Sequence, residues 1–149
     1  MTELEKLDAG LEYNYDDEGV QGRKLRAIEI CERLAEIPQA DVSARTEVIR
    51  ELFLKTGDNP SVLSGFNCDY GLHISVGDNF LANYNVTILD VAPVTIGDEV
   101  MIGPGTLIST VSHPMIPGGR RRHLGIARPV TIGNDVWIGG NVTILMGVN

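Results

Sequence analysis

A six-residue repeat constrains the fold of this chain more than any other feature. Reading from Ile96, the sequence gives IGDEVM, IGPGTL and ISTVSH, and reading from Ile132 it gives IGNDVW, IGGNVT and ILMGVN. An Ile opens every phrase, and a small or β-branched residue usually stands four places later. A period of six fits neither an amphipathic helix, which repeats every 3.6 residues, nor an antiparallel meander. The repeat therefore predicts short stacked strands that are joined by corners.

Each hexad is expected to form one short flat strand and one corner. The aliphatic residue fills the interior, and an adjacent Gly, Asn or Asp tolerates the backbone conformation of the corner. Three hexads then close one coil, and neighbouring coils share backbone hydrogen bonds along the stack. An upstream run through Val76, Ala82 and Ile88 keeps the same step, although Val94 marks a slip of two residues before Ile96.

Charge divides the chain into two segments. Residues 1–60 carry 14 acidic and 8 basic side chains, whereas residues 61–149 carry 6 and 4. In the first segment, apolar residues at helical spacing predict one helix over residues 22–35, ended by Pro38, with Leu25, Ile28 and Leu34 on its apolar face. A second helix is predicted from Asp41, a candidate N-cap, toward a stop at Gly57.

These patterns predict a mainly β protein. Residues 1–60 form an N-terminal α-helical cap, and residues 61–149 form a β-helix that is interrupted by an irregular excursion at 112–128. The acidic start, the absence of a long apolar stretch and a net charge of −8 lead us to expect a cytoplasmic chain that binds neither membranes nor nucleic acid. Two cysteines make neither a disulfide framework nor a zinc knuckle, and Cys68 is interpreted as buried packing.

The order of several short motifs resembles the maltose and galactoside O-acetyltransferases, a family of hexapeptide-repeat acyltransferases. The resemblance covers about residues 2–145 and includes DYG, ANYN, LDV, SHP and TIGNDVWIGG in the family's order and spacing. It implies a left-handed parallel β-helix and a homotrimer with active sites between subunits. It also implies acetyl transfer from acetyl-CoA to a sugar-like hydroxyl, with no metal and no covalent enzyme intermediate.

Such a transfer needs a base, because a hydroxyl is a poor nucleophile near neutral pH. Histidine suits that task. Of the three histidines, His73, His113 and His123, it is His113 that lies at the point where the repeat breaks into the excursion, and it occupies the position of the family's catalytic His. We therefore predict His113 as the general base.

The resemblance also implies the remaining site residues. Gly140 is expected to offer its backbone N–H to the oxyanion or to acetyl-CoA, and Gly103 and Asn83 to approach the cofactor. The acceptor is expected to contact these side chains: Asp69, Asn83, Asp90, Trp137 and Asp17.

Two other interpretations remain open at this stage. Left-handed β-helices also include a γ-type carbonic anhydrase that binds zinc through three histidines, but the histidine spacing here differs from that pattern. The family continues for further coils where this sequence stops at ILMGVN, so a solenoid with impaired or no activity is the second alternative. An open last coil is then expected to associate with other chains.

Overall fold

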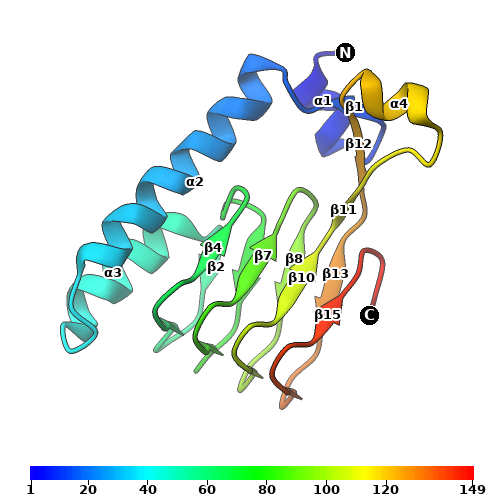
Figure 1. Ribbon diagram of the computed structural model, residues 1–149. Helices are drawn as coiled ribbons and strands as arrows, with labels where there is room; N and C mark the ends of the chain where they lie inside the picture. The colour runs from blue at the N-terminus through cyan, green and yellow to red at the C-terminus, as the bar shows by residue number, and fades with distance from the viewer.

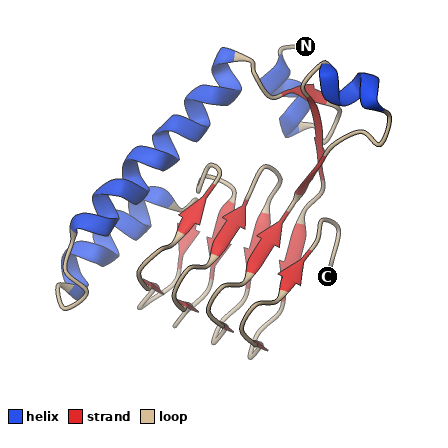
Figure 2. Ribbon diagram, viewed as in Figure 1, coloured by secondary structure: helices blue, strands red, loops and turns tan.

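The hexads fold into short parallel strands that stack in three flat sheets (Figures 1 and 2). The computed structural model describes residues 1–149. Each of the three sheets has four strands and takes one strand from every coil. The first contains β2 (Lys55–Thr56), β5 (Ile74–Val76), β8 (Val94–Ile96) and β13 (Val130–Ile132). The second contains β3 (Ser61–Val62), β6 (Leu81–Ala82), β9 (Met101–Ile102) and β14 (Trp137–Ile138), and the third contains β4 (Asn67–Cys68), β7 (Thr87–Leu89), β10 (Leu107–Ser109) and β15 (Thr143–Ile144).

This arrangement is the left-handed parallel β-helix that was predicted. Val76 pairs with Ile96, and Ile96 pairs with Ile132, so residues that open hexads lie above one another. Equivalent positions in successive coils are 20 residues apart. This spacing is three hexads plus a slip of two residues, such as the one at Val94. The spacing grows to 36 residues where the excursion is inserted. The upstream register through Ala82 and Ile88 is also confirmed, because both residues are fully buried.

The corners have the backbone that their residues favour. Asn59, Asn79, Glu99 and Asp135 adopt positive φ angles between 52° and 58° at one corner of the four coils. Side chains bridge neighbouring coils there, since Asn59 Nδ2 donates to Asn79 Oδ1 at 3.1 Å. The Asn and Asp content of the hexads therefore reflects turn geometry.

Three helices precede or cover the first coil: α1 (Glu3–Asp8), α2 (Glu18–Glu36) and α3 (Val42–Leu52). Helix α2 begins earlier than predicted, and its buried face differs from the predicted one. Leu25 and Ile28 are 57% and 40% exposed, whereas the buried residues of the helix are Val20, Ala27, Ile30, Cys31 and Leu34. Helix α3 ends before Gly57 because Lys55–Thr56 already pair with β5, so the β-helix begins ahead of the boundary predicted at residue 61.

Arg45 joins both long helices to the first coil. Its guanidinium donates to the carbonyl oxygens of Leu34 and Ile37 at 2.9 and 2.8 Å, and to that of Val62 at 2.9 Å. Arg45 is only 7% exposed. A buried charge is stable there because it meets carbonyl dipoles. Beside Arg45, one apolar core runs from α2 and α3 into the coils, and both helices lie along the first coil in Figure 1.

The predicted excursion is a ribbon that rises away from the β-helix (Figure 2). Strand β11 (Val111–Ser112) pairs antiparallel with β12 (Leu124–Ala127), and the short helix α4 (Pro117–Arg121) lies between them. Strand β1 (Tyr13–Asn14), near the N-terminus, adds to the other edge of β12. The segment before α2 is thereby held against the excursion. None of the helices is both long enough and apolar enough to cross a membrane.

Candidate active site

The predicted base lies beside a cavity of about 320 Å³ where three parts of the chain meet. Strand β11 and the residue after it supply Val111 and His113, and β1 and the residue after it supply Tyr13 and Tyr15. Other lining residues come from α2 and the first two coils: Val20, Gln21, Lys24, Asp69, Tyr70 and Leu89. The fold therefore brings two predicted residues, His113 and Asp69, to one cavity.

The hydrogen bond of His113 determines which ring nitrogen can accept a proton. Its Nδ1 lies 2.9 Å from the carbonyl oxygen of Leu124. A carbonyl only accepts, so in the neutral ring Nδ1 carries the hydrogen and Nε2 keeps its lone pair. The ring is exposed and meets the edge of Tyr15 at a centroid distance of 5.5 Å. His113 thus has the tautomer and the exposure that a general base requires.

The N-terminal segment fixes the partner of that hydrogen bond. Asn14 pairs with Leu124 in the β1–β12 ladder, and Tyr15 N donates to the carbonyl oxygen of His123 at 3.0 Å. The Tyr15 ring stacks on the ring of His123, whose Nδ1 contacts the carboxylate of Asp16. Residues 13–16 therefore position the excursion around His113.

Asp69 is a buried carboxylate that lines the same cavity. It is 7% exposed, and its Oδ1 lies 3.3 Å from Lys24 Nζ. Burial and then the charge of Asp69 raise the pKa of Tyr13 to about 12, so that phenol stays protonated near neutral pH. The result is one anionic acceptor and one ammonium donor, which can both bind hydroxyl groups.

A second group of predicted residues lies at a corner of the β-helix outside this cavity. Asn83, Gly103 and Gly139 follow strands β6, β9 and β14 and are stacked, because Asn83 N donates to Ile102 O and Gly103 N to Ile138 O. Gly140 is exposed at this corner. On the outer face of β14, Trp137 is 76% exposed.

Gly140 offers a backbone donor that the ladder between coils does not use. The strand register places Tyr84, Pro104 and Gly140 at equivalent positions in successive coils. Tyr84 N donates to the Oδ1 of Asn83, and Pro104 has no N–H. Gly140 N donates to no group in the chain. This free N–H fits an oxygen that gains negative charge.

Gly103 has a structural reason to be glycine. A Cβ atom there would lie 2.5 Å from the carbonyl carbon of Gly139 in the next coil. The residue is buried. Its absence of a side chain therefore permits the close approach of two coils, whatever contact its corner makes with a cofactor.

Two predicted acceptor ligands are engaged in local structure. Asp17 is the N-cap of α2, and its Oδ1 accepts from Gly19 N at 2.9 Å and Val20 N at 3.3 Å. Asp90 is fully buried, and its carboxylate accepts from the N–H groups of Tyr70 and His73 at 2.9 and 3.2 Å. Burial raises the pKa of Asp90, and the backbone donors oppose that rise. The structure does not direct the Asp90 carboxylate toward solvent.

Known proteins resemble this chain along its whole length. A Saccharomyces cerevisiae protein named as an acetyltransferase is 45% identical over 151 residues, which cover 100% of this chain and 76% of that protein. The galactoside O-acetyltransferase of Escherichia coli K12 is 36% identical over 99% of this chain and 73% of its own length. The chain belongs to the maltose and galactoside type of hexapeptide-repeat acetyltransferases. No protein-family model matches it.

Solved structures of the same family agree with the fold of this acetyltransferase. A maltose O-acetyltransferase from Clostridium difficile 630 superimposes with a TM-score of 0.94 at 36% identity, covering 99% of this chain and 79% of the other. A hexapeptide-repeat acetyltransferase from Vibrio cholerae, complexed with acetyl-CoA, gives 0.85 at 36% identity and covers 99% and 79%. Acetyl-CoA is therefore the acetyl donor that this family uses.

Sequence reasoning missed several residues around the base of this acetyltransferase. Tyr15, Lys24 and Asp16 were not predicted, although the run YNYDD at residues 13–17 contains two of them. Their positions depend on the two-residue strand β1, which pairs with β12 far along the chain. No local sequence pattern predicts that pairing. No group of three or more His, Cys, Asp or Glu side chains within the chain is placed to hold a metal ion. Membership of the acetyltransferase family is what weighs against the γ-type carbonic anhydrase alternative.

Proposed function

We propose that this acetyltransferase transfers the acetyl group of acetyl-CoA to a hydroxyl of a sugar or a related small acceptor, with His113 as the general base. The observation that carries the proposal is the 2.9 Å contact between His113 Nδ1 and the carbonyl oxygen of Leu124. It leaves Nε2 as the proton acceptor at the edge of a cavity that also contains Asp69. The names of the maltose and galactoside relatives support a sugar acceptor.

In this mechanism, the acetyl thioester supplies the electrophilic carbonyl carbon. His113 Nε2 removes the proton from the acceptor hydroxyl as the oxygen attacks, and later returns it to the leaving sulfur. The N–H of Gly140 donates to the oxygen that gains negative charge. Asp69 and Asn83 hold neighbouring hydroxyl groups of the acceptor, and no side chain becomes acetylated.

We also propose that the working site forms between subunits of a homotrimer. Within one chain, the cavity at His113 contains none of Asn83, Gly103, Gly140 or Trp137. An exposed Trp137 on an outer face is typical of a surface that meets another chain. One subunit is then expected to provide His113 and Asp69, and its neighbour to provide Gly140 and Asn83.

Thiol release from acetyl-CoA tests the transfer reaction. The assay compares glucosides, galactosides and maltose as acceptors for the wild-type chain, His113→Ala and His113→Asn. Asn retains an amide donor for Leu124 O but has no Nε2, so both variants should lose about 10²–10⁴-fold in rate. Silence of the wild type with every acceptor supports the inactive-solenoid alternative. Equal rates for the wild type and both variants refute the assignment of His113.

Mixed oligomers test the shared site. Light scattering should first give three times the 16.2 kDa chain mass. His113→Ala and Gly140→Val are then unfolded together and refolded as a mixture. If the two half-sites come from different chains, some interfaces combine an intact half from each and activity returns. Mixed oligomers that stay inactive place both halves in one chain.

A further inference from the structure

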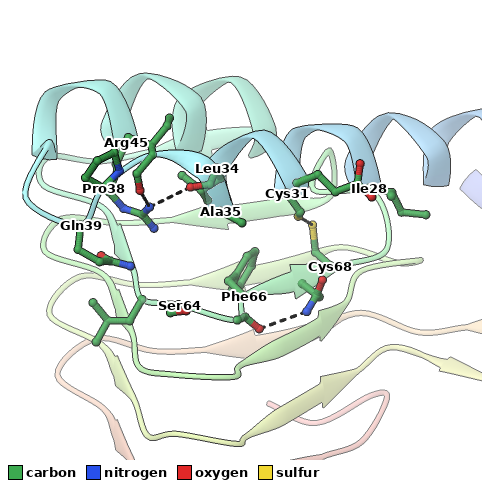
Figure 3. Close-up of a pocket in the computed structure, with 15 residues that line it drawn as sticks. Ile28, Cys31, Leu34, Ala35, Pro38, Gln39, Arg45, Ser64, Phe66 and Cys68 are labelled. Atoms are coloured by element: carbon green, nitrogen blue, oxygen red, sulfur yellow. Dashed lines mark hydrogen bonds between the residues drawn. The ribbon is translucent and has the colours of Figure 1, made fainter.

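A second cavity, of about 440 Å³, lies between α2 and the first coil (Figure 3). None of its lining residues belongs to the cavity at His113. Cys31 from α2 and Cys68 from β4 point toward each other at one side of it, as Figure 3 shows. The lining residues Glu32 and Gln39 are both exposed, so the cavity opens to solvent at that side.

The two thiols are close enough to react with each other. Their sulfur atoms are 3.9 Å apart, and the residues are 9% and 8% exposed. A disulfide needs a separation of about 2.05 Å, so the sulfurs must approach by about 1.9 Å. Rotation of two short side chains next to an open cavity can supply most of that movement. Both cysteines are free thiols.

The contact also makes the two thiols unequal. The hydrogen bond from Cys68 lowers the pKa of Cys31, whereas the same contact and burial raise the pKa of Cys68. The thiolate is the form that attacks an oxidant, and a neighbouring thiol can then resolve the product. Cys31 is thus suited to attack first and Cys68 to resolve.

We propose that Cys31 and Cys68 are a reversible modification site, at which a hydroperoxide joins the α2 helix to the first coil through a disulfide. The Cys31 thiolate attacks one peroxide oxygen and the O–O bond breaks, so Cys31 becomes a sulfenic acid. The other peroxide oxygen leaves with a proton, as water when the oxidant is hydrogen peroxide. The Cys68 sulfur then attacks the Cys31 sulfur, the S–O bond breaks, and that oxygen leaves as water with the proton of Cys68. The two thiols lose two electrons and the peroxide gains them.

The crosslink acts on elements that also form the His113 cavity. Asp69 directly follows Cys68, and Lys24 lies on the same helix as Cys31. These two residues already pair at 3.3 Å. The disulfide closes a loop between positions 37 residues apart, which restricts the unfolded chain. The oxidised protein should therefore unfold about 5–10 °C higher than the reduced protein.

The experiment treats the full wild-type chain with hydrogen peroxide, alkylates it under denaturing conditions and digests it. The expected product is a peptide pair joined through Cys31 and Cys68, which dithiothreitol separates, together with the rise in Tm. In Cys68→Ser, a sulfenic acid on Cys31 should be trapped by dimedone, whereas Cys31→Ser should give little trapped product. Two free thiols after treatment, or disulfides only between chains, overturn the proposal. Because the wild type carries the main readout, the test does not depend on how the variants fold.

Discussion

Replacing Gly103 by Ala tests whether the spacing of the coils is set by the absence of one side chain. The new Cβ would lie 2.5 Å from the carbonyl carbon of Gly139 and 2.6 Å from the N of Gly140. Ordinary contacts begin near 3.4 Å, so the two coils must separate locally by about 1 Å. The opposing atoms are backbone and cannot rotate away.

That separation stretches hydrogen bonds that now have good geometry. Gly103 N donates to Ile138 O at 2.7 Å, and Asn141 N donates to Pro104 O at 2.8 Å. Loss of both bonds, at about 1 kcal/mol each, together with local strain gives an expected loss of about 2–4 kcal/mol in the free energy of unfolding. For a chain of this size, Tm should fall by about 5–12 °C.

Gly133→Ala is the matched control. Gly133 also follows an interior Ile, but a Cβ there meets nothing within 4 Å. That variant should be neutral or slightly more stable, by up to about 1 kcal/mol, because Ala restricts the unfolded chain. Urea unfolding and calorimetry of both variants measure the difference. If Gly103→Ala unfolds within about 0.5 kcal/mol of Gly133→Ala, the steric reasoning is wrong.

Three further changes address other parts of the chain. Arg45→Met should cost about 3–5 kcal/mol in urea unfolding, because it leaves three carbonyl groups without their charged donor; a loss below 1 kcal/mol contradicts this role. Asp17→Ala should lower the free energy of unfolding by about 1 kcal/mol because it removes the N-cap of α2. Asp17→Asn keeps the N-cap, so a change in the KM for the acceptor without a loss of stability in that variant identifies an acceptor contact. The Arg23 guanidinium lowers the pKa of Asp8, so their stabilisation, under about 1 kcal/mol, is present above about pH 4 and is lost as the pH falls through the lower folded value. Asp8→Asn should remove that part of the acid dependence, as seen in Tm measured from pH 6 down to pH 3.

The repeating part of the structure was predictable because the residue type at each position of a hexad indicates whether that position is interior or at a corner. Ile96, Ile102 and Ile108 open successive hexads and are at most 3% exposed. The positive φ angles at Asn79 and Asn85 likewise follow from residue type. Interior packing and turn conformation are local consequences of one residue, so the sequence displays them directly.

The cap and the surroundings of the base were harder to predict because they depend on distant partners. Leu25 and Cys31 are both residues of α2 that could lie on its buried face. The position of the first coil determines that Cys31 is buried and that Leu25 is exposed. The identity of His113 was accessible from its SHP context, but its hydrogen bond to Leu124 O was not. Asp17 was predicted as an acceptor ligand without its N-cap role, which depends on where α2 begins.

The pairing of β1 with β12 imposes an order on folding. Tyr13 and Gly125 are partners, although three of the four coils lie between them in the sequence. Closing so long a loop before the coils exist would cost much entropy, whereas stacked coils bring its ends together. During synthesis, the first coils can form as they emerge, while the N-terminal segment must wait for residue 125. The cavity at His113 is therefore expected to be completed only after the first three coils are in place, so the reactive centre forms on a scaffold that already exists.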